Sequence, residues 1–202
     1  MVKLSVTHLE SLRYWREREG VGIEALIADL THTAPPSPAM LAGRALAKIM
    51  EDPVLKREGL VSASMDGWDF LFECDCELPE PQASELKASI IIPTSSGNVL
   101  LTGKVDMITG RVIRDQKLTE RWDAERYVDS LQWRAYLSMF KAQEFVYDVF
   151  VGRYKDQSVT VTEYHPMRFF SYPDMDKDVH RAVEELAYIV RQHEIFPELP
   201  DG

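Results

Sequence analysis

Two aspartates and one lysine have the types and spacing needed for metal-assisted hydrolysis. Asp106 is followed along the chain by the run Asp115-Gln116-Lys117. Carboxylate oxygens are the ligands that Mg²⁺ and Mn²⁺ prefer, and such ions lower the pKa of bound water and neutralise phosphate charge. A lysine two residues after an acid shares its strand face, where it can orient water or stabilise developing negative charge. The three residues therefore predict a site for phosphodiester hydrolysis.

The residues between the two aspartates predict how they meet. Thr109-Gly110 separates two runs of alternating character, and we expect it to form a two-residue turn between antiparallel strands. That turn places Asp106 opposite Ile113. Because strand residues alternate between faces, Asp106, Asp115 and Lys117 then project to one side, with the aspartates roughly 7–8 Å apart. A longer loop or a bulge would shift this register.

Three short motifs occur in an order typical of a known superfamily. They resemble the active-site series of the RecB-like and viral recombination exonucleases, which belong to the PD-(D/E)XK superfamily. The motifs are Gly103-x-x-Asp106, Asp115-x-Lys117 and Gln132-x-x-x-Tyr136. Each motif alone is weakly specific, but their order on a strand–turn–strand–helix pattern is more so. The resemblance covers about residues 39–151.

The resemblance implies a role for each motif. The two aspartates would bind metal, together with the backbone carbonyl of Gln116, and Lys117 would be catalytic. Gln132 and Tyr136 lie one helical turn apart and so share a helix face. They would contact the site or the DNA. The cofactor implied is Mg²⁺ or Mn²⁺.

The sequence departs from the family pattern in three places. Val105 stands where the family name has proline. In the family, a histidine or a glutamate of the upstream helix usually supplies another metal ligand. In the helix expected at 43–51, Ala47 occupies the place expected for the histidine, so Glu51 and Glu73 are the candidates to replace it. The four cysteines of an iron–sulfur cluster are absent from the sequence, so no such cluster is expected.

Basic residues near the N-terminus have two interpretations. By resemblance, Arg13 or Arg16 would grip phosphate. Alternatively, both belong to a charged helix face that also carries Glu17 and Glu19. A further lysine, Lys104, is expected to lie opposite the second aspartate as a cross-strand ion-pair partner.

Hydrophobic periodicity predicts a mixed α/β fold, with a central mixed β-sheet flanked by helices. The resemblance implies a restriction-endonuclease-like core. We expect one domain over 1–202 with a helical N-terminal part at about 1–60. Helices are expected over 4–29, 39–51, 124–141 and 174–193, and strands over 68–78, 86–92, 99–108, 111–118, 145–154 and 158–164.

Composition limits the class of protein. The formal net charge is −10, which argues against a nucleic-acid coat protein but allows an enzyme with a local basic groove. Apolar runs are strand-sized, so neither a membrane span nor a signal peptide is expected. The cysteines, Cys74 and Cys76, have a spacing poorly suited to a disulfide, so we expect a reducing cytoplasm.

Three functions remain open at this stage. The first is a metal-dependent DNA exonuclease of phage or mobile-element recombination, which resects duplex ends and passes single strands to an annealing protein; a homo-oligomer is compatible with it. The second is an inactive member of the fold that binds nucleic acid or a protein partner, suggested by Ala47 and the acidic charge. The third is an assembly protein that matches the motifs by accident.

Overall fold

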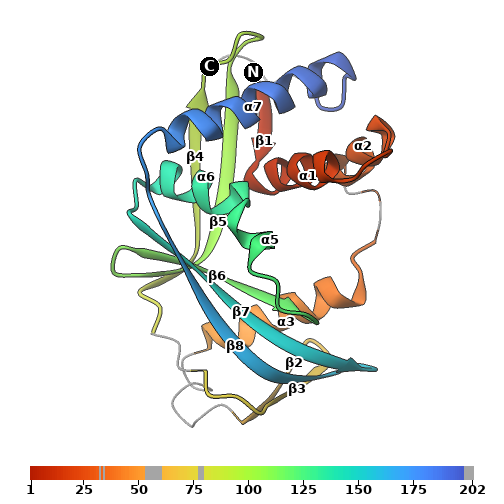
Figure 1. The fold of residues 1–202 in the computed structure, drawn as a ribbon, viewed down its shortest axis with the longest axis vertical. Helices are drawn as coiled ribbons and strands as arrows, with labels where there is room; N and C mark the ends of the chain where they lie inside the picture. The colour runs from red at the N-terminus through yellow and green to blue at the C-terminus, as the bar shows by residue number, and fades with distance from the viewer. Residues whose placement is uncertain (32, 34, 53–60, 77–79, 198–202) are drawn as a thin grey trace.

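The computed structural model describes residues 1–31, 33, 35–52, 61–76 and 80–197. These residues form a mixed α/β fold around an eight-stranded sheet in the order β1-β5-β6-β7-β8-β3-β2, with β4 paired to β5 outside that path (Figure 1). The strands are β1 (Val2–Ser5), β2 (Ser62–Met65), β3 (Trp68–Phe72), β4 (Ala83–Ile92), β5 (Val99–Thr109), β6 (Val112–Thr119), β7 (Glu144–Lys155) and β8 (Ser158–Phe170). The helices are α1 (Val6–Glu17), α2 (Ile23–Thr31), α3 (Pro38–Glu51), α5 (Glu125–Val128), α6 (Leu131–Phe140) and α7 (Met175–Gln192).

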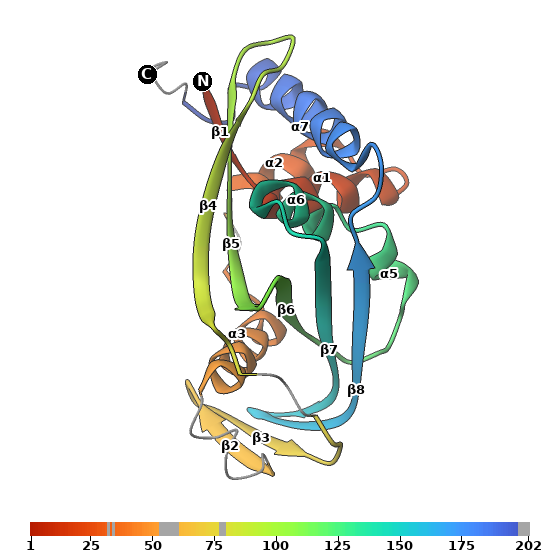
Figure 2. The ribbon, with the colours of Figure 1, turned by 90° about the vertical axis from the view of Figure 1, so that its left-hand side faces the viewer.

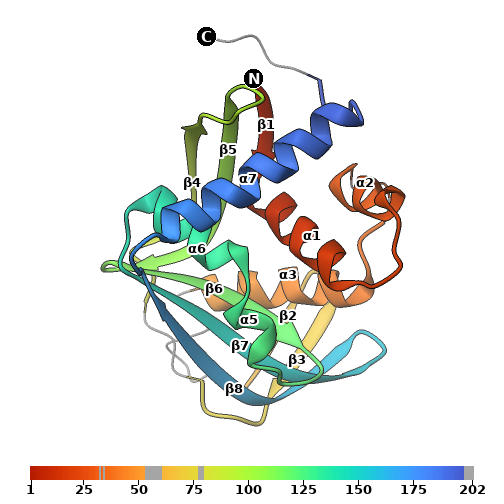
Figure 3. The same ribbon diagram turned by 45° about the horizontal axis from the view of Figure 1, so that its top comes forward.

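Helices cover different parts of the two sheet faces. On one side α1, α2, α6 and α7 bury the larger core together with β1, β5, β6 and β7 (Figure 2). Figure 3 shows α7 crossing α6 close to α1, with which it also packs. On the other side α3 buries a second core against β3, β7 and β8. Strand β7 contributes to both cores, because successive strand residues point to opposite faces: Val149 belongs to the first core and Phe150 to the second.

The N-terminus begins as a strand, which corrects the expectation of helix alone. β1 pairs in parallel with β5, from Val2 opposite Val99 to Ser5 opposite Thr102. Ser5 then caps α1, and its side chain accepts a hydrogen bond from the backbone N–H of His8. The short apolar alternation of β1 is too brief to be distinguished from the start of a helix.

The helix expected over 124–141 is broken into α5 and α6. Ser130 interrupts it, because its hydroxyl accepts a hydrogen bond from the backbone N–H of Gln132 and caps α6. The strand expected over 68–78 ends at Phe72, and Leu78 lies outside the described residues. The strands expected over 145–154 and 158–164 are present as the β7–β8 hairpin, with Asp156 at a φ of 54° in the turn.

Two findings bear on membrane and redox chemistry. Of the helices that the structure describes, none is both long enough and apolar enough to cross a membrane. Cys74 and Cys76 are both free thiols.

Candidate active site

The β5–β6 hairpin carries the two aspartates, in a register that differs from the predicted one. Thr109 pairs with Val112, so the two turn residues are Gly110 and Arg111, with Gly110 at a φ of 63°. Ile108, not Asp106, therefore lies opposite Ile113. The expected turn was wrong by one residue because glycine is needed at the first, positive-φ position. The pairing moves by two residues, which leaves every side chain on its predicted face.

The site lies at a break in the sheet. One edge of β5 pairs with β1 as far as Thr102 and with β6 only from Met107 onward, so the edge from 103 to 106 has no strand beside it. Two side-chain contacts occupy this break. The Tyr136 hydroxyl donates to the carbonyl of Lys104 at 2.7 Å, and the backbone N–H of Gln116 donates to Asp106 Oδ2 at 3.3 Å.

Asp106, Asp115 and Lys117 meet at this break. Lys117 Nζ is 2.6 Å from Asp115 Oδ2, and Asp115 is only 2% exposed. Burial raises the pKa of Asp106 to about 7, with the negative charge of Asp115 adding to the effect. Burial also raises the pKa of Asp115, against the opposing charge of Lys117. The two carboxyl groups thus share a poorly solvated place where negative charge is costly.

Lys117 is tied to this pair yet reachable from outside. Burial acts to lower its pKa, but the charge of Asp115 and the hydrogen bond with it raise the pKa above its usual value. Its side chain remains 34% exposed. The ammonium group is therefore held in its charged form and remains accessible from outside the protein.

Helix α6 contacts both strands of the hairpin through two residues one turn apart. Gln132 Nε2 donates to Asp115 Oδ1 at 2.8 Å on β6. Tyr136 reaches β5 instead, at the Lys104 carbonyl, and its ring packs against Gly103. The pair thus spans the break and fixes one strand to the other.

Helix α3 places two candidate positions, Ala47 and Glu51, near Asp106. Ala47 lines a cavity of about 720 Å³ together with Asp106, Gln116 and Lys117; we call this cavity the lower cleft. Glu51, one turn after Ala47, is near enough for its charge to contribute to the raised pKa of Asp106. The structure therefore brings Glu51 into the neighbourhood of the two aspartates.

Glu73 stands elsewhere. It is exposed and follows β3, which is separated from β6 by β7 and β8. Neighbouring strands lie about 4.8 Å apart, so three strand spacings separate the residue from β6. The structure does not bring Glu73 together with the other candidate ligands. Lys104 also differs from expectation, since it pairs with Glu85 and not with the second aspartate.

The two N-terminal arginines are engaged by carboxylates. Arg13 is 7% exposed and lies 3.0 Å from Glu10 and 2.7 Å from Glu17. Arg16 is exposed, and its Nε donates to Glu185 on α7 at 2.9 Å. Arg13 thus holds α1 together, and Arg16 joins α1 to α7.

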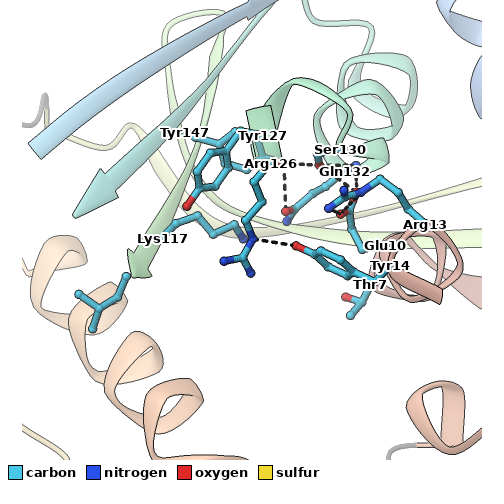
Figure 4. Close-up of a pocket in the computed structure, with 11 residues that line it drawn as sticks. Thr7, Glu10, Arg13, Tyr14, Lys117, Arg126, Tyr127, Ser130, Gln132 and Tyr147 are labelled. Carbon is cyan, nitrogen blue, oxygen red and sulfur yellow. Dashed lines mark hydrogen bonds and ion pairs between the residues drawn. The ribbon is translucent and has the colours of Figure 1, made fainter. Parts of the chain in front are cut away.

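A second cavity, the central pocket, opens between α1 and β6 (Figure 4). Sequence reasoning missed several of its residues, which come from α1, α5, α6 and β7. Arg126 extends toward Tyr14 and donates to its hydroxyl at 3.2 Å. The ring of Tyr147 lies 5.6 Å from Lys117 Nζ. Tyr147 on β7 pairs with Asp115 on β6. Its place at the site depends on which strand lies beside β6, and no local sequence pattern shows that.

A third cavity, the lysine groove, continues past Thr7, which lines both it and the central pocket. Together the three cavities are lined by eight basic residues and three acidic ones. The basic residues are Lys3, Arg13, Arg44, Lys87, Lys104, Lys117, Arg121 and Arg126, and the acidic ones are Glu10, Asp106 and Glu120. Basic residues thus outnumber acidic ones in the lining around the break, in a chain whose formal net charge is −10.

The donor set suits a hard divalent cation. Asp106 and Asp115 both offer carboxylate oxygens. The charge of Asp115 already disfavours the ionisation of Asp106, and a cation would relieve that repulsion. Within the described ranges, no three His, Cys, Asp or Glu side chains already form a group that could hold a metal. Two further oxygen ligands are candidates to complete the set. The Gln116 carbonyl is adjacent to Asp115 in the sequence, and the charge of Glu51 acts on Asp106.

Solved structures share this fold. The crystal structure of SSO0001 matches with a TM-score of 0.55 and 15% identity, covering 94% of this chain and 76% of that one. The structure of LHK-Exo in complex with dAMP matches with a TM-score of 0.50 and 14% identity, covering 95% of this chain and 93% of that one. LHK-Exo is an alkaline exonuclease from Laribacter hongkongensis. No protein-family model matches the sequence, and neither does any curated protein. The chain thus shares the nuclease-like fold of LHK-Exo, as expected from the resemblance to exonucleases.

Proposed function

We propose that this chain is a Mg²⁺- or Mn²⁺-dependent deoxyribonuclease that degrades DNA from duplex ends. The observation that supports it most is the convergence of Asp106, Asp115 and Lys117 at a break in the sheet. An accidental motif match would leave no reason for a buried and a half-buried carboxyl group to lie together beside an ammonium group.

Each residue would have a distinct task. Asp106, Asp115 and the Gln116 carbonyl would hold the metal ion, with Glu51 completing the set. Such an ion would supply an acidified water and neutralise charge on the scissile phosphate. Lys117, fixed as an ammonium by Asp115, would stabilise negative charge that develops on the phosphate. Gln132 would hold the Asp115 carboxylate in orientation.

The surroundings favour a nucleic-acid substrate. Basic residues line the cavities on either side of the three residues, and a duplex end presents closely spaced phosphates. The crystal structure of LHK-Exo holds dAMP, a product expected of an exonuclease that acts on DNA. By the resemblance, the biological setting is phage or mobile-element recombination, with a single-strand annealing protein as partner and a homo-oligomer as the assembly.

Degradation of linear and covalently closed circular duplex DNA with Mg²⁺ or Mn²⁺ tests this proposal. We expect loss of the linear form alone, and none in excess chelator. Lys117→Ala should abolish cleavage without unfolding the chain, whereas the matched Lys177→Ala, on an exposed site of α7, should behave as the parent. Equal rates in Lys117→Ala and the parent would overturn the assignment, and cleavage of closed circles would overturn the exonuclease part.

A catalytically inactive member of the fold is the second candidate. The observation that favours it is Ala47 in the lower cleft, at the position where the resemblance leads us to expect a histidine. Calorimetric titration with Mn²⁺ discriminates between the two. Site-specific binding that is lost in Asp106→Asn supports the nuclease, and the absence of binding, or binding that ignores this substitution, supports the inactive protein.

A further inference from the structure

The open face of the sheet beside the candidate active site carries the lysine groove, which has a volume of about 600 Å³. In the upper part of Figure 2 the described helices cover β1, β4 and β5 on one side only. Strand register brings the polar side chains of the uncovered side together. Ser5 and Ser89 both pair with Thr102, and Lys87 pairs with Lys104.

We propose that the lysine groove binds the phosphodiester backbone of a single DNA strand that continues from the scissile bond. The proposal rests on the proposed nuclease function and extends it to a further binding surface. It assigns the contacts to Lys3 and Lys87, with Lys104 beside them.

Charge is the first support. Of the described residues that line the groove, three are lysines and none is acidic. Lys104 is engaged by Glu85, but Lys3 and Lys87 are exposed and have no carboxylate within ion-pair distance among the residues the structure describes. Two exposed ammonium groups on one face of a chain with a net charge of −10 are suited to anionic phosphate.

Continuity is the second support. Thr7 lines both the groove and the central pocket, and Lys104 is two residues before Asp106 on β5. The central pocket in turn shares Lys117 with the lower cleft, which Asp106 lines, so a strand held at the two aspartates would reach the groove through the central pocket. Helix α1 also begins here, and its N-terminal end adds a favourable partial charge for phosphate.

Size and lining favour a single strand. A volume of about 600 Å³ is that of a small-molecule site, which is too small for a duplex. Tyr136 is the aromatic residue at its wall, and it is 4% exposed with its hydroxyl bound to the Lys104 carbonyl. Bases therefore have no free ring to stack on, and recognition should depend on phosphate alone, without sequence preference.

Fluorescence anisotropy of a labelled oligo(dT), with Ca²⁺ in place of Mg²⁺ and over a range of salt, tests the groove. The variant is Lys3→Gln/Lys87→Gln, and the control is Lys177→Gln/Arg181→Gln, which removes the same charge from exposed sites on α7. We expect the groove variant to bind about tenfold more weakly. The slope of log affinity against log salt should fall by about 1.4, or about 0.7 for each phosphate that a lysine no longer neutralises. The control should match the parent.

The outcomes separate this proposal from the proposed function. Parental affinity and slope in the groove variant would overturn the groove assignment, even if the parent cleaves DNA, and would leave this face to another occupant. A reduced slope in the groove variant alone would support the assignment, even if no preparation cleaves DNA, in which case only the nuclease proposal fails. Equal losses in variant and control would also overturn it, since net charge and not this groove would then govern binding.

Discussion

Gln132 donates its side-chain amide to Asp115 Oδ1 over 2.8 Å, and Gln132 is itself held by α1. Glu10 Oε1 accepts from the backbone N–H of Gln132 and from the hydroxyl of Ser130, both at 2.8 Å. The hydroxyl of Tyr147 lies 2.7 Å from Ser130 Oγ and 3.2 Å from Gln132 Oε1. The N-terminal helix is thus connected by hydrogen bonds to a candidate metal ligand.

Glu10→Ala should therefore impair catalysis, although Glu10 has no proposed contact with the substrate. It removes the acceptor that fixes Gln132, so the Asp115 carboxylate loses its orientation. Loss of such a supporting partner commonly lowers metal affinity or activity by about 10- to 100-fold. We expect a fall in kcat and in Mn²⁺ affinity with KM for DNA nearly unchanged, measured by steady-state kinetics and calorimetry.

Two variants control for loss of structure. Glu10→Gln keeps an oxygen acceptor and should recover most of the activity. Glu17→Gln removes the other carboxylate of Arg13, at 2.7 Å, which is remote from Gln132 in the hydrogen-bond network and should leave kcat unchanged. If Glu10→Ala has the parental kcat and Mn²⁺ affinity, α1 does not position the site.

Asp106→Asn should stabilise the metal-free protein at pH 8. Burial and the charge of Asp115 raise the pKa of Asp106 to about 7 in the folded state. A group whose folded pKa is raised contributes stability below its unfolded pKa of about 4 and loses it as pH rises through 7. Asparagine keeps the acceptor for the Gln116 N–H but carries no charge.

Urea unfolding in chelator measures the effect. We expect a gain on the order of 2 kcal/mol at pH 8 that shrinks as pH falls from 7 toward 4, where Asp106 of the parent is protonated. The same substitution should abolish site-specific Mn²⁺ binding. A loss of stability at pH 8 would contradict the prediction, because it would show that the ionised Asp106 carboxylate stabilises the folded protein.

The active-site hairpin could be predicted from the sequence because it is local. Alternation over a few residues determines which face Asp106, Asp115 and Lys117 share, and a two-residue change in pairing preserves that face. The turn position and the direct partner of each residue were not predictable with the same certainty, because Thr109-Gly110 and Gly110-Arg111 are equally short turns.

Contacts between distant segments could not be predicted. Arg114 and Asp148 form a buried ion pair at 2.5 Å across β6 and β7, joined by the hydroxyl of Tyr164, which is 2.6 Å from Asp148. Glu10 and Gln132 are even farther apart along the chain. Periodicity shows that a side chain faces inward but not which strand or helix faces it, so the supporting residues of the site emerged only from the fold.

Ala47→His should raise the affinity for divalent cations. Ala47 lines the lower cleft together with Asp106, and it is partly exposed, so an imidazole has room there. Imidazole can bind Mn²⁺, although it binds Zn²⁺ more tightly. We expect about a tenfold gain for Mn²⁺ by calorimetry, on the scale at which single ligand-sphere changes act.

The matched variant is Ala47→Leu, which adds bulk without a donor atom. It should bind Mn²⁺ no better than the parent. If Ala47→His and Ala47→Leu bind the ion equally, the α3 position does not reach the ion, and Glu51 one turn later becomes the only candidate from this helix.

Gly103→Ala should destabilise the fold through Tyr136. A Cβ at residue 103 would lie 2.7 Å from Tyr136 Cε1 and 3.0 Å from Val6 Cγ2. The ring has little freedom to withdraw, because the Tyr136 hydroxyl is bound to the Lys104 carbonyl. Overpacking of this kind costs about 1–3 kcal/mol, which chemical denaturation would detect.

The clash also predicts coupling between the two residues. Tyr136→Leu alone should destabilise by removing the ring and its hydrogen bond, but in the Tyr136→Leu background the added methyl group should cost much less, so the two effects should not add. Gly43→Ala is the control, since an added Cβ there meets nothing within 4 Å and a helical alanine is favoured. Strict additivity of Gly103→Ala and Tyr136→Leu would contradict the inference that the absence of a side chain at Gly103 allows Tyr136 of α6 to pack against β5.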